Sequence, residues 1–127
     1  MKILATDRTP EVDFNFAGHH LRLKGESYPE DVATFYAPVF EALDNYLADL
    51  SDGTCRFDFE LIYFNSSSAR AIMSLLEKLE DAAARGASVS INWYYDEEDD
   101  TMQELGAEFG EDLEHATFRV EKLVLPE

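Results

Sequence analysis

Residues 56–86 decide the fold, and they read RFDFELIYFNSSSARAIMSLLEKLEDAAARG. Apolar side chains occupy every second position from Phe57 to Tyr63, which predicts a strand, and apolar residues then recur at helical spacing until Gly86. Residues 65–68, Asn-Ser-Ser-Ser, connect the predicted strand to the predicted helix, so three hydroxyls lie at the N-terminus of a helix. Unpaired N–H groups and the positive end of the helix dipole make such a terminus favourable for a phosphate, either bound or covalently attached.

The residues alone leave two interpretations of this segment open. In the first, a serine is phosphorylated and the segment acts as a switch. In the second, Asn65 or a serine only caps the helix, since asparagine and serine are among the preferred residues at the N-cap position. The first predicts a regulated binding protein, and the second predicts an unregulated interaction or scaffold domain of the same fold.

Composition narrows the class of protein. The chain has 127 residues, 46% of them hydrophobic, which suits one core and predicts a single domain over residues 1–127. Ten Lys and Arg against 27 Asp and Glu give a formal charge of -17, which disfavours nucleic acid and anionic membranes as partners. Cys55 is the single cysteine, which fits a reducing compartment. The sequence shows neither a signal-peptide core nor a bilayer-spanning run, so we expect a cytoplasmic protein.

The rest of the chain predicts further strands and helices. Alternation at residues 12–16 and 20–24, around a short turn, predicts a β-hairpin. Ser27 and Glu30 have capping-box spacing and precede a helical stripe that reaches Leu50. The remaining predictions are a strand over residues 88–95, a helix that starts at Thr101 with Glu104 at capping-box spacing, and a strand from Thr117 to Leu123.

This order of elements, β-β-α-β-α-β-α-β, predicts an α/β fold. We expect a single mixed, largely parallel sheet of about five strands, because helices separate most of the strands. Strands in a sheet covered on both faces are apolar throughout, whereas most strands here alternate apolar and polar residues. The three helices should therefore lie mainly on one face of the sheet.

The carboxyl edge of the sheet is the expected functional surface. Right-handed crossovers bring the carboxyl ends of parallel strands to one edge, where sites in such folds lie. Three loops should meet there: Gly25–Glu30, Asn65–Ser68 and Tyr94–Asp100. The acidic run Asp96–Asp100 lacks the glycine and the ligand spacing of an EF-hand loop, so we interpret it as solvated rather than metal-binding. No cofactor is predicted.

A Ser-His-acid hydrolase is the weakest interpretation. The chain has no Gly-x-Ser-x-Gly elbow, and His19 and His20 fall at the hairpin turn, which should lie at the opposite edge from the serines. His115 lies in the last loop, far along the chain. No catalytic residue is predicted.

Three stretches of the chain resemble the signature segments of the SiaC family of bacterial regulatory phosphoproteins. They are residues 25–30, 61–68 and 93–96, and they occur in the same order, at matching separations and with matching helices between them. More distantly, the strand-serine-helix unit resembles the STAS domains of anti-sigma factor antagonists. Here Asn65 replaces the Asp of that pattern and Ser68 replaces a Gly.

The resemblance implies a STAS-like partner-switching module with no enzymatic activity of its own. Its acceptor hydroxyl maps onto Ser66, where the family pattern often has threonine, and Ser67 is the alternative. It also implies a cognate kinase, a PP2C-type phosphatase and a diguanylate cyclase that the unphosphorylated form binds and activates. A homodimer through the open sheet face or the hairpin edge stays open. The candidate partner-binding residues are Glu26, Ser27, Tyr28, Pro29, Asn65, Ser67, Ser68, Tyr94, Tyr95 and Asp96.

Overall fold

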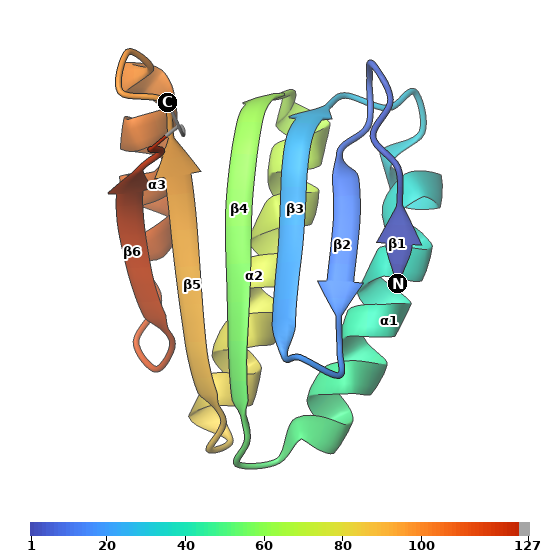
Figure 1. The fold of residues 1–127 in the computed structure, drawn as a ribbon, viewed down its shortest axis with the longest axis vertical. Helices are drawn as coiled ribbons and strands as arrows, with labels where there is room; N and C mark the ends of the chain where they lie inside the picture. Colours follow the sequence, from blue (N-terminus) through green and yellow to red (C-terminus); the bar gives the residue numbers. More distant parts are fainter. Residues whose placement is uncertain (125–127) are drawn as a thin grey trace.

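The computed structural model describes residues 1–124 and folds around one six-stranded sheet (Figure 1). The strands follow one another across the sheet in the order of the sequence. The strands are β1 (Lys2–Ile3), β2 (Glu11–Asn15), β3 (His20–Ser27), β4 (Thr54–Phe64), β5 (Ser88–Tyr95) and β6 (Thr117–Lys122). The helices are α1 (Val32–Leu50), α2 (Ser66–Ala84) and α3 (Asp100–Gly110).

The expected α/β fold is confirmed. β1, β2 and β3 pair antiparallel, and β3 to β6 pair parallel, so the sheet is mixed and largely parallel. Figure 1 shows all three helices behind the sheet, on one face. The sheet has six strands rather than the expected five. The additional strand is β1, which was not predicted because its two residues are too few to show an alternating pattern.

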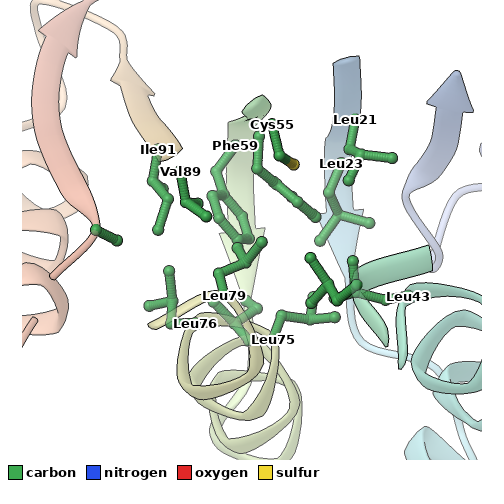
Figure 2. Packing of buried hydrophobic residues seen from close by; sticks show 14 of the residues in the cluster. Leu21, Leu23, Leu43, Cys55, Phe59, Leu75, Leu76, Leu79, Val89 and Ile91 are labelled. Carbon is green, nitrogen blue, oxygen red and sulfur yellow. The ribbon is translucent and has the colours of Figure 1, made fainter. Parts of the chain in front are cut away.

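The core lies between the helices and the sheet. Leu75 and Leu79 of α2 point toward the side chains of the sheet, Phe59 among them (Figure 2). All three side chains are fully buried, as is the indole of Trp93 at 1% exposure. Burial of each large apolar side chain contributes about 1.5–3 kcal/mol, so the alternating strands are held with their apolar side toward the helices. Gly86, at φ +118°, follows α2, as expected for a residue just beyond a helix end.

The opposite face of the sheet is polar and centred on Asp58. Its carboxylate accepts hydrogen bonds from His20 Nε2 at 2.7 Å, Asn92 Nδ2 at 2.9 Å and Arg56 Nε at 3.1 Å. Burial by itself raises the pKa of Asp58, but the hydrogen bonds from Asn92, His20 and Arg56 outweigh it and hold the pKa below its usual range. This network explains why polar residues alternate with apolar ones along β3, β4 and β5.

Two predicted helix starts are wrong. α1 is capped by Asp31, whose Oδ1 accepts from the Thr34 N–H at 3.0 Å, and not by Ser27. α3 is capped by Asp99, whose Oδ1 accepts from the Met102 N–H at 3.0 Å, and not by Thr101. In both cases an aspartate next to the helix supplies the capping oxygen, and Ser27 instead ends a strand.

Pairing along β4 is asymmetric. The β3–β4 ladder runs to Ser27 and Phe64, but the β4–β5 ladder stops at Phe59 and Trp93, and Figure 1 shows the two strands splaying above that point. The register with β3 also shifts near Gly25, so β4 gains one residue there. The alternation predicted as far as Tyr63 therefore fails at the end of the strand.

Among the described residues, no helix is both long and apolar enough to cross a membrane.

Candidate functional site

The carboxyl ends of β3 and β4 are joined directly beneath the start of α2. The Asn65 N–H donates to the Ser27 carbonyl at 3.2 Å, which holds two of the expected loops together. Tyr28 of the first loop meets Tyr63, near the end of β4, edge to face with ring centroids 5.8 Å apart. The third loop follows β5, on the far side of the splay, and its Asp99 borders the same hollow as Phe64.

The three serines at the start of α2 have different environments. Asn65 caps the helix, because its Oδ1 accepts from the Ser68 N–H at 2.9 Å. Ser66 and Ser67 are exposed, whereas Ser68 is fully buried. Two of the three hydroxyl side chains are therefore accessible from solvent in this conformation.

Ser68 belongs to a buried chain of hydroxyls. Ser27 Oγ donates to Ser68 Oγ at 2.8 Å, and the Tyr36 hydroxyl lies 2.7 Å from Ser27 Oγ. Since Ser27 has one hydroxyl proton, Tyr36 is the donor in the second bond. Burial raises the pKa of Tyr36 to about 12, which keeps that phenol protonated. These hydrogen bonds between hydroxyls link α1, β3 and α2 beneath the exposed serines.

The candidate partner-binding residues divide into two groups. Ser27 and Ser68 are fully buried and reach no partner in this conformation. The Tyr94 hydroxyl accepts from Arg56 at 3.2 Å, so Tyr94 covers the open sheet face. Exposed or half-buried side chains belong to Glu26, Tyr28, Pro29, Asn65, Ser67, Tyr94, Tyr95 and Asp96.

The acidic loop is organised by its own backbone. Asp96 Oδ1 accepts from the Glu98 N–H at 2.9 Å, and Asp99 caps α3. Within residues 1–124, no group of three or more His, Cys, Asp or Glu side chains has a geometry that would hold a metal ion.

The histidines lie away from the serines. His19 Nδ1 hydrogen-bonds the Tyr46 hydroxyl at 2.7 Å, and His20 ends on Asp58. His115 Nδ1 donates to Glu80 at 3.0 Å. Cys55 of β4 belongs to the hydrophobic core and is fully buried, and burial raises the pKa of its thiol to about 11. This geometry gives Ser66 no histidine base.

Two exposed residues were not among the candidate site residues predicted from the sequence. Ile62 is 67% exposed and Tyr63 is 50% exposed at the end of β4. The signal was present, because residues 61–64 are apolar without interruption and so break the alternation that a one-sided strand requires.

A mixed sheet covered on one face, with exposed hydroxyls where its central strand leads into a helix, defines a single-sheet α/β domain. The comparison with protein families identifies the family. Residues 3–123 match the SiaC family of regulatory phosphoproteins, and the chain belongs to that family. The family resemblance seen in the sequence is thereby confirmed.

Relatives and solved structures agree with this membership. The chain is 34% identical over 112 residues to an uncharacterized protein of Pseudomonas aeruginosa strain UCBPP-PA14, covering 88% of each sequence. It is similar to apo-SiaC from Pseudomonas aeruginosa, with a TM-score of 0.88 and 32% identity over 95% of this chain and 97% of that one. It is also similar to a chain in the complex of the diguanylate cyclase SiaD with its activator SiaC, from the same species. That match has a TM-score of 0.87 and 31% identity over 95% of this chain and 99% of the other.

Proposed function

We propose that this protein is a phosphorylation-controlled binding protein of the cytoplasm with no catalytic activity of its own. Ser66 is the acceptor, and Ser67 is the alternative. A cognate kinase adds the phosphate, a PP2C-type phosphatase removes it, and the unmodified form binds and activates a signalling enzyme such as a diguanylate cyclase. Membership of a family of regulatory phosphoproteins supports the proposal, as does the likeness to a structure of SiaC with the cyclase that it activates.

The observation that carries the proposal is the exposure of Ser66 and Ser67 at the N-terminus of α2, with Ser68 buried below them. A phosphate there gains favourable interactions with the helix dipole and the free N–H groups. It adds about -1.5 to -2 charges and should not melt the helix. The switch therefore lies in recognition by the partner rather than in a change of fold.

The free energy required is plausible for one buried phosphate. To move a partner from about 99% to about 1% bound takes a differential binding free energy of about 5.5 kcal/mol. A phosphate that is covered in the complex without a counter-charge loses its hydration, which is a large penalty. The surface around Ser66 offers partner contacts through Tyr28, Pro29, Asn65 and Ser67, while Ser27 and Ser68 support it from beneath.

A second candidate function is an unregulated interaction domain. One observation favours it: Asn65 already caps α2, so this part of the motif has a structural role without phosphate.

Mass spectrometry of the protein purified from its native host, with and without phosphatase inhibition, separates the two functions. One added phosphate on Ser66 or Ser67 supports the switch, and its absence under all growth conditions supports the unregulated domain. In a binding assay with a partner captured from the same host, Ser66→Asp should abolish binding and Ser66→Ala should keep it. Equal binding by both variants would place the switch elsewhere.

A further inference from the structure

The splay of β4 and β5 leaves a groove at the carboxyl edge. Beyond Phe59, the side of β4 that faces β5 has no strand partner within residues 1–124. Two hollows of about 540 and 290 Å³ border this free edge and share Ile62 and Asp99. We call this surface the β4–β5 groove, and its defining residues are Glu60, Ile62, Tyr63, Asp96, Glu98 and Leu123.

The floor of the groove is apolar and exposed. Ile62 and Tyr63 are among the few large hydrophobic side chains that the described chain leaves in water, at 67% and 50% exposure. Leu123 lines the same hollow as Ile62. Neighbouring exposed apolar side chains in a concave surface mark an interaction site, because their removal from water is favourable.

The rim of the groove is acidic. Glu60, Asp96 and Glu98 line the same hollow as Ile62 and Leu123. Glu60 lies 3.8 Å from Lys24, whereas Asp96 and Glu98 form no ion pair within residues 1–124. Glu97, the neighbour of both, is paired with Lys122. Two carboxylates at the rim are therefore available to cations supplied by a partner.

We infer that the β4–β5 groove binds a segment of a partner protein in which apolar side chains are flanked by lysine or arginine. The apolar floor and the acidic rim complement those two kinds of side chain. The inference rests on the proposed function, because it names the chemistry of the partner that the edge recognises. Ser66 follows Phe64, which lines the groove, so a bound segment lies close to the modified hydroxyl.

A basic segment would also attract a phosphate on Ser66. The proposed switch therefore requires that the complex cover Ser66 closely enough for desolvation of the phosphate to outweigh this attraction. Whether a phosphate on Ser66 strengthens or weakens partner binding is therefore independent of whether the groove binds the partner segment.

The test uses the ¹⁵N-labelled full chain and two synthetic peptides of equal length. Both peptides have the same leucines, and they differ only in having lysine or glutamate at the remaining positions. The lysine peptide should shift the backbone amides of residues 60–64 and 94–99 in a saturable way, and the glutamate peptide should leave them unchanged. Equal shifts with both peptides, shifts spread over the whole surface, or no shifts would overturn the inference.

Matched variants separate the groove from general charge attraction. Ile62→Ser should weaken binding of the lysine peptide about tenfold, while Met73→Ser, another exposed apolar residue, should not change it. Asp96→Asn with Glu98→Gln should weaken binding more than Glu111→Gln with Asp112→Asn, which removes the same charge elsewhere. Equal losses in the two double variants would reduce the effect to net charge and overturn the inference.

Phosphoserine introduced at residue 66 by genetic encoding distinguishes the two proposals. Binding of the lysine peptide in the groove of the unmodified chain supports the inference whatever the phosphate does. If the groove binds and the phosphate leaves partner binding unchanged, the proposed function fails alone. If the phosphate abolishes partner binding while the peptide never binds in the groove, the inference fails alone.

Discussion

The two halves of β4 differ in pairing and in exposure. From Arg56 to Phe59 the strand has a neighbour on both sides, and Phe57 and Phe59 are fully buried. From Glu60 to Phe64 it pairs, among the described strands, with β3 alone, and it exposes Ile62 and Tyr63. A strand that is central in the order of the sheet is thus not central along its whole length. The candidate binding surface begins where the ladder to β5 stops.

On the face of the sheet that the helices cover, aromatic side chains pack between the diverging ends of β4 and β5. Phe109 of α3 packs against Phe64 with ring centroids 5.9 Å apart, and against Trp93 at 5.4 Å. Aromatic contacts of this kind stabilise beyond their buried area, so α3 helps to hold the end of β4 on the side where the ladder to β5 has stopped.

The largest effect on stability should come from the half of β4 that pairs with a strand on both sides. Phe59→Ala removes a fully buried ring that stacks on Phe57 at 4.5 Å and contacts Trp93. The free energy of unfolding should fall by about 3–5 kcal/mol, as measured by urea denaturation. A loss below about 1 kcal/mol would mean that this half of the strand is not the anchor of the core.

Glu80 should give the next largest effect, on the β6 side of the splay. Its carboxylate accepts from the N–H groups of Glu114, His115 and Ala116 at 2.8–3.0 Å, which fixes the loop that leads into β6. Glu80→Ala should cost about 2 kcal/mol at neutral pH in urea denaturation. Lys78→Ala, on the same helix, should cost clearly less, because it pairs with Asp44, whose side chain is 54% exposed, and water weakens such an ion pair.

The cost of Glu80→Ala should depend on pH. Burial raises the pKa of Glu80, but the hydrogen bonds from Ala116, His115 and Glu114 outweigh it and lower the pKa from 4.5 to about 2. A carboxylate with a lowered pKa in the folded state contributes stability above its unfolded pKa and loses it as the pH falls toward the folded pKa. The difference between wild type and variant should therefore shrink from about pH 4.5 to about pH 2. A constant difference over that range would contradict the assignment.

A smaller effect should come from the hydroxyl chain next to the half of β4 that pairs with β3 alone. Ser27→Ala leaves the Tyr36 hydroxyl without its acceptor in a buried site, which should cost about 1–2 kcal/mol. Ser67→Ala, on the exposed side of the same helix start, should stay within about 0.5 kcal/mol. Equal thermal unfolding of the two variants would show that the hydroxyl chain adds nothing to stability.

The smallest effect on stability should come from Ile62. Its side chain is 67% exposed, so Ile62→Ser should change the free energy of unfolding by no more than about 0.5 kcal/mol. Thermal and urea denaturation of the variant check this. A loss comparable with that of Phe59→Ala would make the free half of β4 part of the core and remove its separate role.

The sequence predicted the order of elements and the side of the sheet that the helices cover, because alternation and helical spacing are local signals. It also gave Asn65, together with the serines, as a possible helix cap, and Asn65 is the residue that caps α2. It did not predict β1, whose two residues show no pattern, nor the capping residues Asp31 and Asp99. Several nearby side chains had suitable capping chemistry, and tertiary packing selects among them.

The candidate site was predicted less completely than the fold. Residues of the three loops do lie at one edge, but the burial of Ser27 and Ser68 depends on Tyr36, which is contributed by a different element. The splay that exposes Ile62 results from the register shift with β3 and from the packing of α3. Contacts between distant parts of the chain of this kind leave little trace in local sequence patterns.

The unequal burial of the three serines constrains how this tract can vary over evolutionary time. A threonine at residue 66 or 67 adds a methyl group in water and keeps a hydroxyl that a kinase could modify. A threonine at residue 68 adds the same methyl group to a site with no exposed surface, next to Ser27. The three serines therefore comprise two positions at which serine and threonine can exchange and a third at which burial disfavours threonine.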